Sequence, residues 1–94
     1  MRYGRPTLAR IRTARRLLAR SLSSGVIECI ASADPTGARM DRYSIAWSIR
    51  DLDTIIREFS SSSDLVKSVA LNTAMADRRF FLERAQRLGC MGAI

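Results

Sequence analysis

Three arginines, Arg12, Arg16 and Arg20, recur at every fourth position near the start of the chain. On a helix, this spacing places them in one row along one side. Like charges four residues apart disfavour a helix by about 0.2–0.5 kcal/mol per pair, so the row indicates a polyanion or an acidic partner. Two other interpretations remain open. The row can be an ordinary solvated face, and an Arg-rich, acid-free, amphipathic start can also be a cleavable organelle transit peptide.

The positive charge of the chain is concentrated in the same segment. The 94 residues carry a net charge of +7. Residues 1–20 contain seven arginines and no acidic residue, whereas residues 21–94 contain nine basic and nine acidic residues. The first segment therefore supplies the whole net charge. Arginines in such a segment can contact phosphates without reading a base sequence.

The composition argues against catalysis and against a cofactor or metal. The chain has no histidine, which removes His-dependent acid–base pairs and His-containing zinc sites. It also lacks paired carboxylates at a fixed spacing and a Gly-rich phosphate loop, so we expect no enzyme. Cys29 and Cys90 lie far apart without a CxxC spacing, and we predict free thiols in a reducing compartment. Uncharged runs are far shorter than the roughly 20 residues of a membrane span, so a soluble protein is expected.

The N-terminal half is predicted to contain a helix followed by a β-hairpin. Thr7 caps an apolar series with helical spacing that begins at Leu8, and Gly25 is expected to end the helix in a left-handed conformation. The runs 26–33 and 39–47 alternate in polarity and flank a sequence suited to a type I turn, Asp34-Pro35-Thr36-Gly37. We therefore expect two antiparallel strands.

A second helix is predicted from Ser48 to about Phe59. Ser48 and Asp51 match a capping box, and Trp47 and Leu52 occupy the two positions of a hydrophobic staple around it. Trp47 could also stack on a ligand, but at this position we expect it to pack. The predicted fold is α+β, with two helices packed on a two-stranded antiparallel β-hairpin in a domain of residues 1–59. Its expected core consists of Leu18, Leu22, Ile45, Leu52, Ile55 and Phe59.

Residues 60–94 are predicted to form a C-terminal helical arm with an apolar tail. Ser61 or Ser63 is expected to cap a third helix that ends at Leu88, before Gly89. Phe80 and Phe81 point about 100° apart on a helix, so one core cannot easily bury both rings. The arm is therefore expected to become ordered against another subunit or a partner.

The second predicted helix also carries a family motif. Ser48-Ile49-Arg50-Asp51-Leu52, followed by Ile56, Glu58 and Phe59, resembles the S-x-x-D-L-x-x-x-I-x-E-[LF] signature of gpW-like head-to-tail joining proteins of tailed bacteriophages. The predicted order of helix, hairpin and helix over residues 8–59 is similar to that family, and so is Gly89-x-x-Gly92 with an apolar end.

The resemblance implies a structural head-to-tail connector, or adaptor, rather than an enzyme. Its implied partners are a portal protein, the next tail-side connector or stopper protein, further copies in a ring of twelve, and packaged DNA. The implied location is the virion, after synthesis in the bacterial cytoplasm, without membrane contact. Arg12, Arg16 and Arg20 would face DNA or a partner. The portal- or subunit-binding arm would use Phe80, Phe81, Arg84, Arg87, Leu88, Met91 and Ile94. The alternative is a small basic module that binds nucleic acid or a protein.

Overall fold

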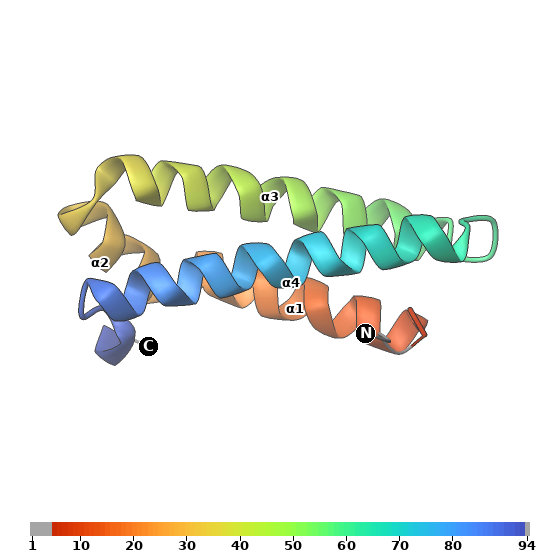
Figure 1. Ribbon diagram of the computed structural model, residues 1–94, viewed down its shortest axis with the longest axis horizontal. Coiled ribbons are helices and arrows are strands. Elements are labelled where there is room, and N and C mark those ends of the chain that lie inside the picture. The colour runs from red at the N-terminus through yellow and green to blue at the C-terminus, as the bar shows by residue number, and fades with distance from the viewer. Residues whose placement is uncertain (1–4, 94) are drawn as a thin grey trace.

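The computed structural model describes residues 5–93, and its regular elements in that range are all helices (Figure 1). Helix α1 covers Leu8–Ser23, α2 covers Gly25–Ala33, α3 covers Pro35–Arg57 and α4 covers Asp64–Arg87, and a 3₁₀ turn, η1, covers Met91–Ala93. The three long helices lie side by side, with α3 antiparallel to α1 and α4. The short helix α2 joins α1 to α3 at one end of the bundle, beside η1.

The predicted α+β fold is wrong, because both expected strands are helical. Residues 26–33 belong to α2 and residues 39–47 to α3. In α2 the buried side chains are Val26, Ile27 and Ile30, which lie on one helical face. In α3 the buried residues Ala38, Asp41, Ile45 and Ser48 recur every three or four positions, which is the spacing of one helical face.

The expected turn between the strands is the start of α3. The Asp34 carboxylate accepts a hydrogen bond from the Gly37 amide at 2.9 Å, as an N-cap does, and Pro35 occupies the first helical position. A type I turn has nearly the same backbone angles as the first turn of a helix. The sequence Asp-Pro-Thr-Gly suits both, and here the chain continues as a helix.

The predicted capping box at Ser48 is also wrong. Ser48 lies in the middle of α3, and its buried hydroxyl donates a hydrogen bond to the Asp77 carboxylate of α4. Trp47 lies inside α3 and is 48% exposed. The expectation that it packs in the core is therefore wrong. Gly25 likewise does not end α1 in a left-handed conformation, because it is the first residue of α2.

The two ends predicted for the C-terminal helix are correct. Ser63 caps α4 by accepting from the Val66 amide at 3.1 Å. At the other end Gly89 adopts φ +70°, and the amides of Gly89 and Cys90 donate to Gln86 and Ala85. These two bonds form a Schellman motif, which turns the chain back toward the bundle.

One hydrophobic core runs through the bundle. Leu18, Ile45, Leu52 and Ile55 are buried as predicted, whereas Leu22 and Phe59 are only partly buried at its edge. Helix α4 contributes to the same core and packs on α1, α2 and α3, so it does not form a separate arm. The full set of buried apolar residues is Ile11, Ala14, Leu18, Val26, Ile27, Ile30, Ala38, Ile45, Leu52, Ile55, Leu71, Ala74, Phe81, Ala85 and Cys90.

Cys29 and Cys90 are joined in a disulfide, which corrects the prediction of free thiols. The bond links α2 to the segment after α4, and Cys90 is 1% exposed. Disulfides of this kind are typical of oxidising compartments. In the part of the chain that the structure describes, no helix is both long enough and apolar enough to cross a membrane.

Candidate nucleic-acid interface

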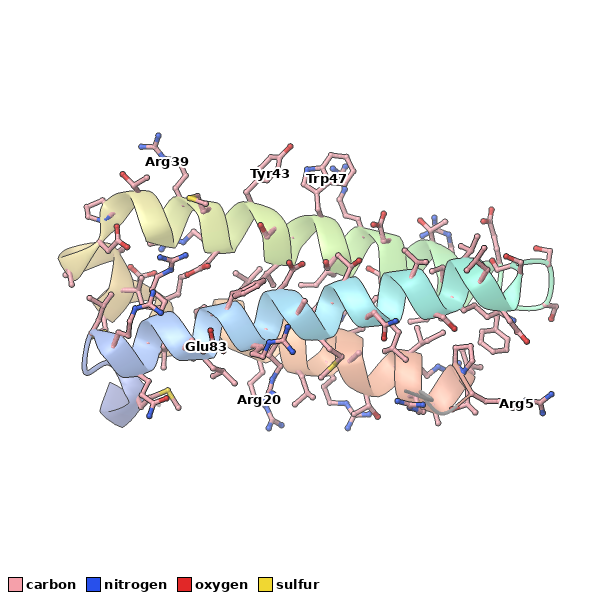
Figure 2. The ribbon with its side chains drawn as sticks, viewed as in Figure 1. Arg5, Arg20, Arg39, Tyr43, Trp47 and Glu83 are labelled. Atoms are coloured by element: carbon pink, nitrogen blue, oxygen red, sulfur yellow. A yellow bond between two sulfur atoms is a disulfide. The ribbon has the colours of Figure 1, made fainter. Side chains whose placement is uncertain are left out.

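Helix α1 separates its arginines from its apolar side chains. Ile11, Ala14 and Leu18 are buried against the bundle, while Arg12, Arg16 and Arg20 are exposed on its outer side. We call these three residues the arginine ridge. Figure 2 shows Arg20 on the opposite side of the molecule from Arg39, Tyr43 and Trp47.

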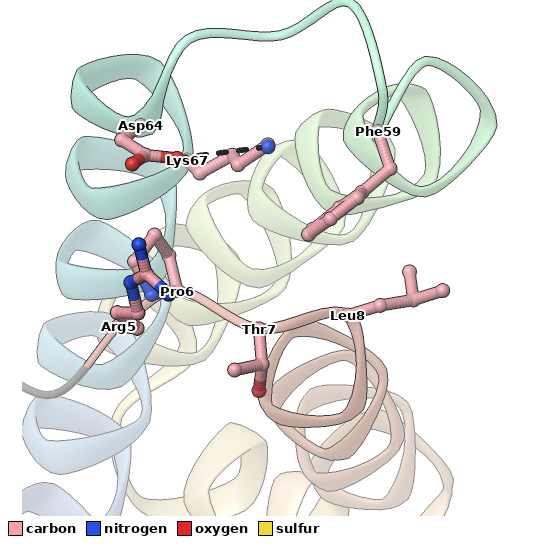
Figure 3. A pocket seen from close by; sticks show the side chains of 7 residues that line it. All are labelled: Arg5, Pro6, Thr7, Leu8, Phe59, Asp64 and Lys67. Atoms are coloured by element: carbon pink, nitrogen blue, oxygen red, sulfur yellow. Dashed lines mark ion pairs between the residues drawn. The ribbon is translucent and has the colours of Figure 1, made fainter.

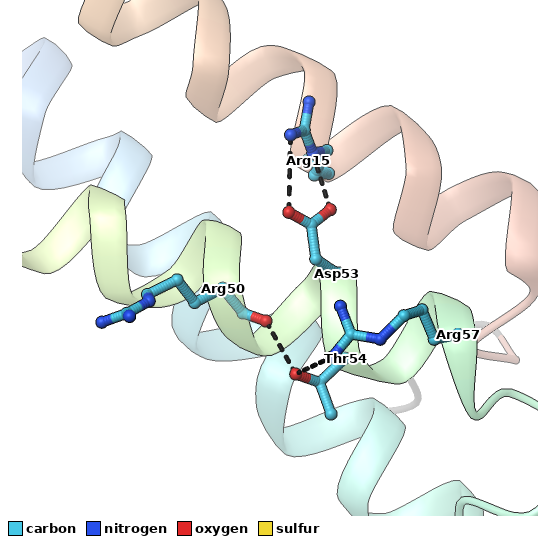
Figure 4. A network of polar contacts seen from close by, with 5 residues as sticks. All are labelled: Arg15, Arg50, Asp53, Thr54 and Arg57. Atoms are coloured by element: carbon cyan, nitrogen blue, oxygen red, sulfur yellow. Dashed lines mark hydrogen bonds and ion pairs between the residues drawn. The ribbon is translucent and has the colours of Figure 1, made fainter.

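The arginine at the edge of the packed face has a structural role. Arg15 points toward α3, where its Nε and Nη2 atoms donate to the two carboxylate oxygens of Asp53 at 2.8 and 3.4 Å (Figure 4). The hydrogen bonds and the negative charge of Asp53 raise the pKa of Arg15. This pair joins α1 to α3 and uses the Nε and Nη2 donors of Arg15.

The ridge, by contrast, has no acidic partner among residues 5–93. No carboxylate lies within 4.0 Å of Arg12, Arg16 or Arg20, although Asp34, Asp41, Asp53, Glu28 and Asp64 all form ion pairs elsewhere. Eight residues of helix separate the first and last of the three, which corresponds to about 12 Å along the axis. The ridge is thus a row of three exposed guanidinium groups without an ion pair in the described range, and it shares that lack of an acidic partner with Arg39, Arg57, Arg79 and Arg87 on α3 and α4.

A pocket lies at the N-terminal end of α1 (Figure 3). It has a volume of about 280 Å³ and is lined by Arg5, Pro6, Thr7, Leu8, Phe59, Asp64 and Lys67. The Lys67 ammonium lies 3.8 Å from the centre of the Phe59 ring and 3.7 Å from the Asp64 carboxylate. Both contacts hold this buried lysine in place. The exposed Arg5 extends the basic surface past the start of α1.

The predicted arm residues fall into three groups. Phe81 is 2% exposed in the core, and Arg84 forms ion pairs with Asp34 and Asp41 of the α3 start. Four further residues of the predicted arm, Phe80, Arg87, Leu88 and Met91, are exposed. Ile94 lies outside the described residues.

Two exposed aromatic residues lie together on α3, and one of them is Trp47, which was expected to pack. Tyr43 is 66% exposed and packs edge-on against Trp47, with the ring centres 6.2 Å apart. Arg50 lies over the Trp47 ring at 5.3 Å. Their helical spacing was visible in the sequence, because positions 43, 47 and 50 share one side of a helix while the core positions 45, 48 and 52 share another.

Comparisons with protein-family models, with curated proteins and with solved structures give no significant match to this chain. Within residues 5–93, no group of three or more Cys, Asp or Glu side chains is arranged so that it could hold a metal ion. The arginine ridge is the regular row of like charges on α1 from which a function is argued below.

Proposed function

We propose that this chain is a non-catalytic binding module that holds the phosphate backbone of a nucleic acid on the outer side of α1. The observation that carries the proposal is the row itself: three exposed arginines recur at every fourth position along one side of α1, and none of them has an acidic partner in residues 5–93. Over the roughly 12 Å length of the ridge, each strand of a duplex presents about three to four phosphates. Three guanidinium groups on a rigid helix match that number.

The proposed contact is independent of base sequence. Arginines on the exposed side of one helix can neutralise phosphates, and the net charge of +7 attracts a polyanion from a distance. The exposed aromatic side chains Tyr43 and Trp47 lie on the opposite side of the molecule from Arg20, so they cannot stack on bases of the same bound segment. Affinity should therefore depend strongly on salt and weakly on sequence.

The test is the salt dependence of binding to a short DNA duplex, measured by fluorescence anisotropy. The Arg12→Gln/Arg16→Gln/Arg20→Gln variant should bind more weakly, and the slope of log K against log salt should fall by about 2.7, or 0.9 for each lost phosphate contact. Glutamine has nearly the helix propensity of arginine, so folding should be preserved.

A charge-matched control separates a defined interface from general basicity. The Arg39→Gln/Arg57→Gln/Arg87→Gln variant loses the same charge from exposed positions outside α1. It should keep most of the wild-type slope. Equal losses in the two triple variants would contradict an interface on α1, and absence of duplex binding at low salt would contradict the proposed ligand.

The head-to-tail connector role implied by the gpW-like resemblance remains a prediction. The helix–hairpin–helix order that carried the resemblance is replaced by four helices, so the fold gives this role no additional support. A connector should bind DNA weakly until it assembles on its portal, whereas a free-standing module should bind as the isolated protein. The same binding experiment therefore distinguishes the two roles.

A further inference from the structure

The outer face of the α3–α4 pair carries exposed apolar side chains at both ends. Near the C-terminal end of α3, a groove of about 500 Å³ is lined by residues of α3 and α4 alone, among them Ile55, Leu65, Val66 and Val69. Near the N-terminal end of α3, a groove of about 210 Å³ is lined by Met40 and Phe80 together with polar side chains of the same two helices. Neither groove includes a residue of α1 or α2, so both lie on one face of the bundle.

This face exposes large apolar side chains among polar ones. The exposed fractions are 73% for Leu65, 56% for Val69, 55% for Phe80 and 59% for Met40. Leu65, Val69 and Phe80 recur at helical spacing on α4, while the core positions of that helix, Leu71, Ala74, Phe81 and Ala85, lie on another side. Large apolar side chains grouped on one exposed face and rimmed by polar residues commonly mark a contact with another protein.

We infer that the α3–α4 face binds a second copy of this chain in a two-fold symmetric dimer. A two-fold axis across the middle of two antiparallel helices places the Leu65–Val69 end of one copy against the Met40–Phe80 end of the other. Each copy then offers protruding apolar side chains to a groove of its partner, which is the self-complementary arrangement that an isologous contact requires.

The size of the face is sufficient for such a dimer. Helix α3 has 23 residues and is about 35 Å long, and two packed helices are about 20 Å wide. The product, about 700 Å², is close to the roughly 800 Å² that each partner contributes to a standard stable interface.

The distribution of charge also permits a second copy. The seven arginines of residues 1–20 lie outside α3 and α4, and these two helices carry nine basic and six acidic residues, a smaller excess of +3. Two copies can therefore meet through α3 and α4 without bringing their basic segments together. Both arginine ridges remain exposed on the outer sides of the dimer, because α1 packs on the inner side of α3 and α4.

The test is the molar mass of the purified protein over a wide concentration range, by sedimentation velocity in the absence of nucleic acid. The wild type should change from monomer to dimer and stop there, and the dimer should persist at raised salt. The emission of Trp47, the only tryptophan in the chain, should shift to shorter wavelength as the dimer forms. Trp47 is exposed on α3 and lies seven residues from both Met40 and Thr54, which line the two grooves, so all three share one side of the helix.

Two variants locate the interface. Leu65→Glu/Val69→Glu places two charges on the face and should raise the dimer Kd at least tenfold, while circular dichroism stays unchanged because both side chains are exposed. Met75→Glu is the control, since Met75 is also exposed on α4 but lines a groove with α1 residues. It should dimerise like the wild type.

Several results would overturn the inference. A wild type that remains monomeric at every concentration excludes a second copy as the occupant and leaves the face to a different protein. Growth beyond the dimer contradicts the two-fold contact, because a heterologous contact continues to add copies. Equal loss of dimer in the Met75 control, or an intact dimer in the double variant, places the contact elsewhere. Dissociation of the dimer by salt and nuclease would mean that nucleic acid bridges the two copies.

Discussion

The Arg84 guanidinium of α4 donates from Nε to Oδ2 of Asp41 in α3 at 2.9 Å. The same guanidinium reaches Asp34, the N-cap of α3, through Nη1 at 3.3 Å. The Asp41 side chain is 7% exposed and that of Arg84 is 20% exposed, so both charges are largely removed from water. This cluster joins the last turns of α4 to the first turns of α3.

Arg84→Gln should destabilise the fold by about 3 kcal/mol, because it leaves the Asp41 carboxylate buried without a cation. Urea unfolding measures the change. Adding Asp41→Asn should recover much of the loss, since the remaining buried group is then neutral. Arg87→Gln, three residues further along the same helix and exposed, should change stability by less than about 0.5 kcal/mol. Equal effects at positions 84 and 87 would show that the ion pair contributes little.

The sequence predicted the helices whose ends are marked by local signals. Thr7 begins α1 and Ser63 begins α4, each by accepting a hydrogen bond from the amide three residues later. Gly89 ends α4 in a left-handed conformation. The same conformation was expected of Gly25, and that expectation was wrong. These signals act within a few residues, so they can be recognised without knowledge of the tertiary structure.

The hairpin was predicted incorrectly because its residues suit two structures. Asp34 and Pro35 can begin either a type I turn or a helix, and short apolar runs fit both a period of two and a period near 3.6. The helical spacing becomes clear only when the segment is extended past position 47, because Ile45 and Leu52 then fall on one side of a helix and are both buried. The disulfide and the partners of Arg84 were missed because each joins segments far apart in the chain.

Gly37→Ala should destabilise the protein, although alanine is the better helix former. In an exposed helix the substitution would gain up to about 1 kcal/mol. Here the added methyl group would overlap the Asp34 carboxylate and crowd the Arg84 guanidinium, so the N-cap and the ion pair must move apart. A lower melting temperature for the variant is the expected result. A melting temperature above that of the wild type would mean that the Asp34 side chain can move aside at little cost.

The stability of the fold should depend on the ionisation of Asp77. Partial burial raises the pKa of this carboxyl group, the hydrogen bond from Ser48 opposes the shift, and the negative charge of Asp41 adds to it. The folded state therefore binds this proton more tightly than the unfolded state does. The resulting stabilisation is fully present below the unfolded pKa, near 3.9, and is lost as pH rises through the folded pKa.

Asp77→Asn removes this titration and keeps a group that can accept the Ser48 hydrogen bond. At pH 7 the variant should melt at a higher temperature than the wild type, and the difference should disappear near pH 3. Melting curves of both proteins over this pH range provide the measurement. A variant that is less stable at pH 7 would show that the ionised carboxylate has a favourable partner, and the predicted sign would be wrong.

Removal of the disulfide should weaken the whole bundle, because Cys90 belongs to its core and holds η1 against α2. The bond closes a separation of 61 residues, for which chain entropy predicts a stabilisation of about 4 kcal/mol. The protein purified without reductant and then denatured should contain no titratable thiol, and it should contain two after reduction. Reduction, or Cys29→Ser/Cys90→Ser, should lower the free energy of unfolding measured with urea by about 4 kcal/mol. Two free thiols in the unreduced protein would support the original prediction of a reducing compartment, and an unchanged midpoint would show that η1 contributes little to the fold.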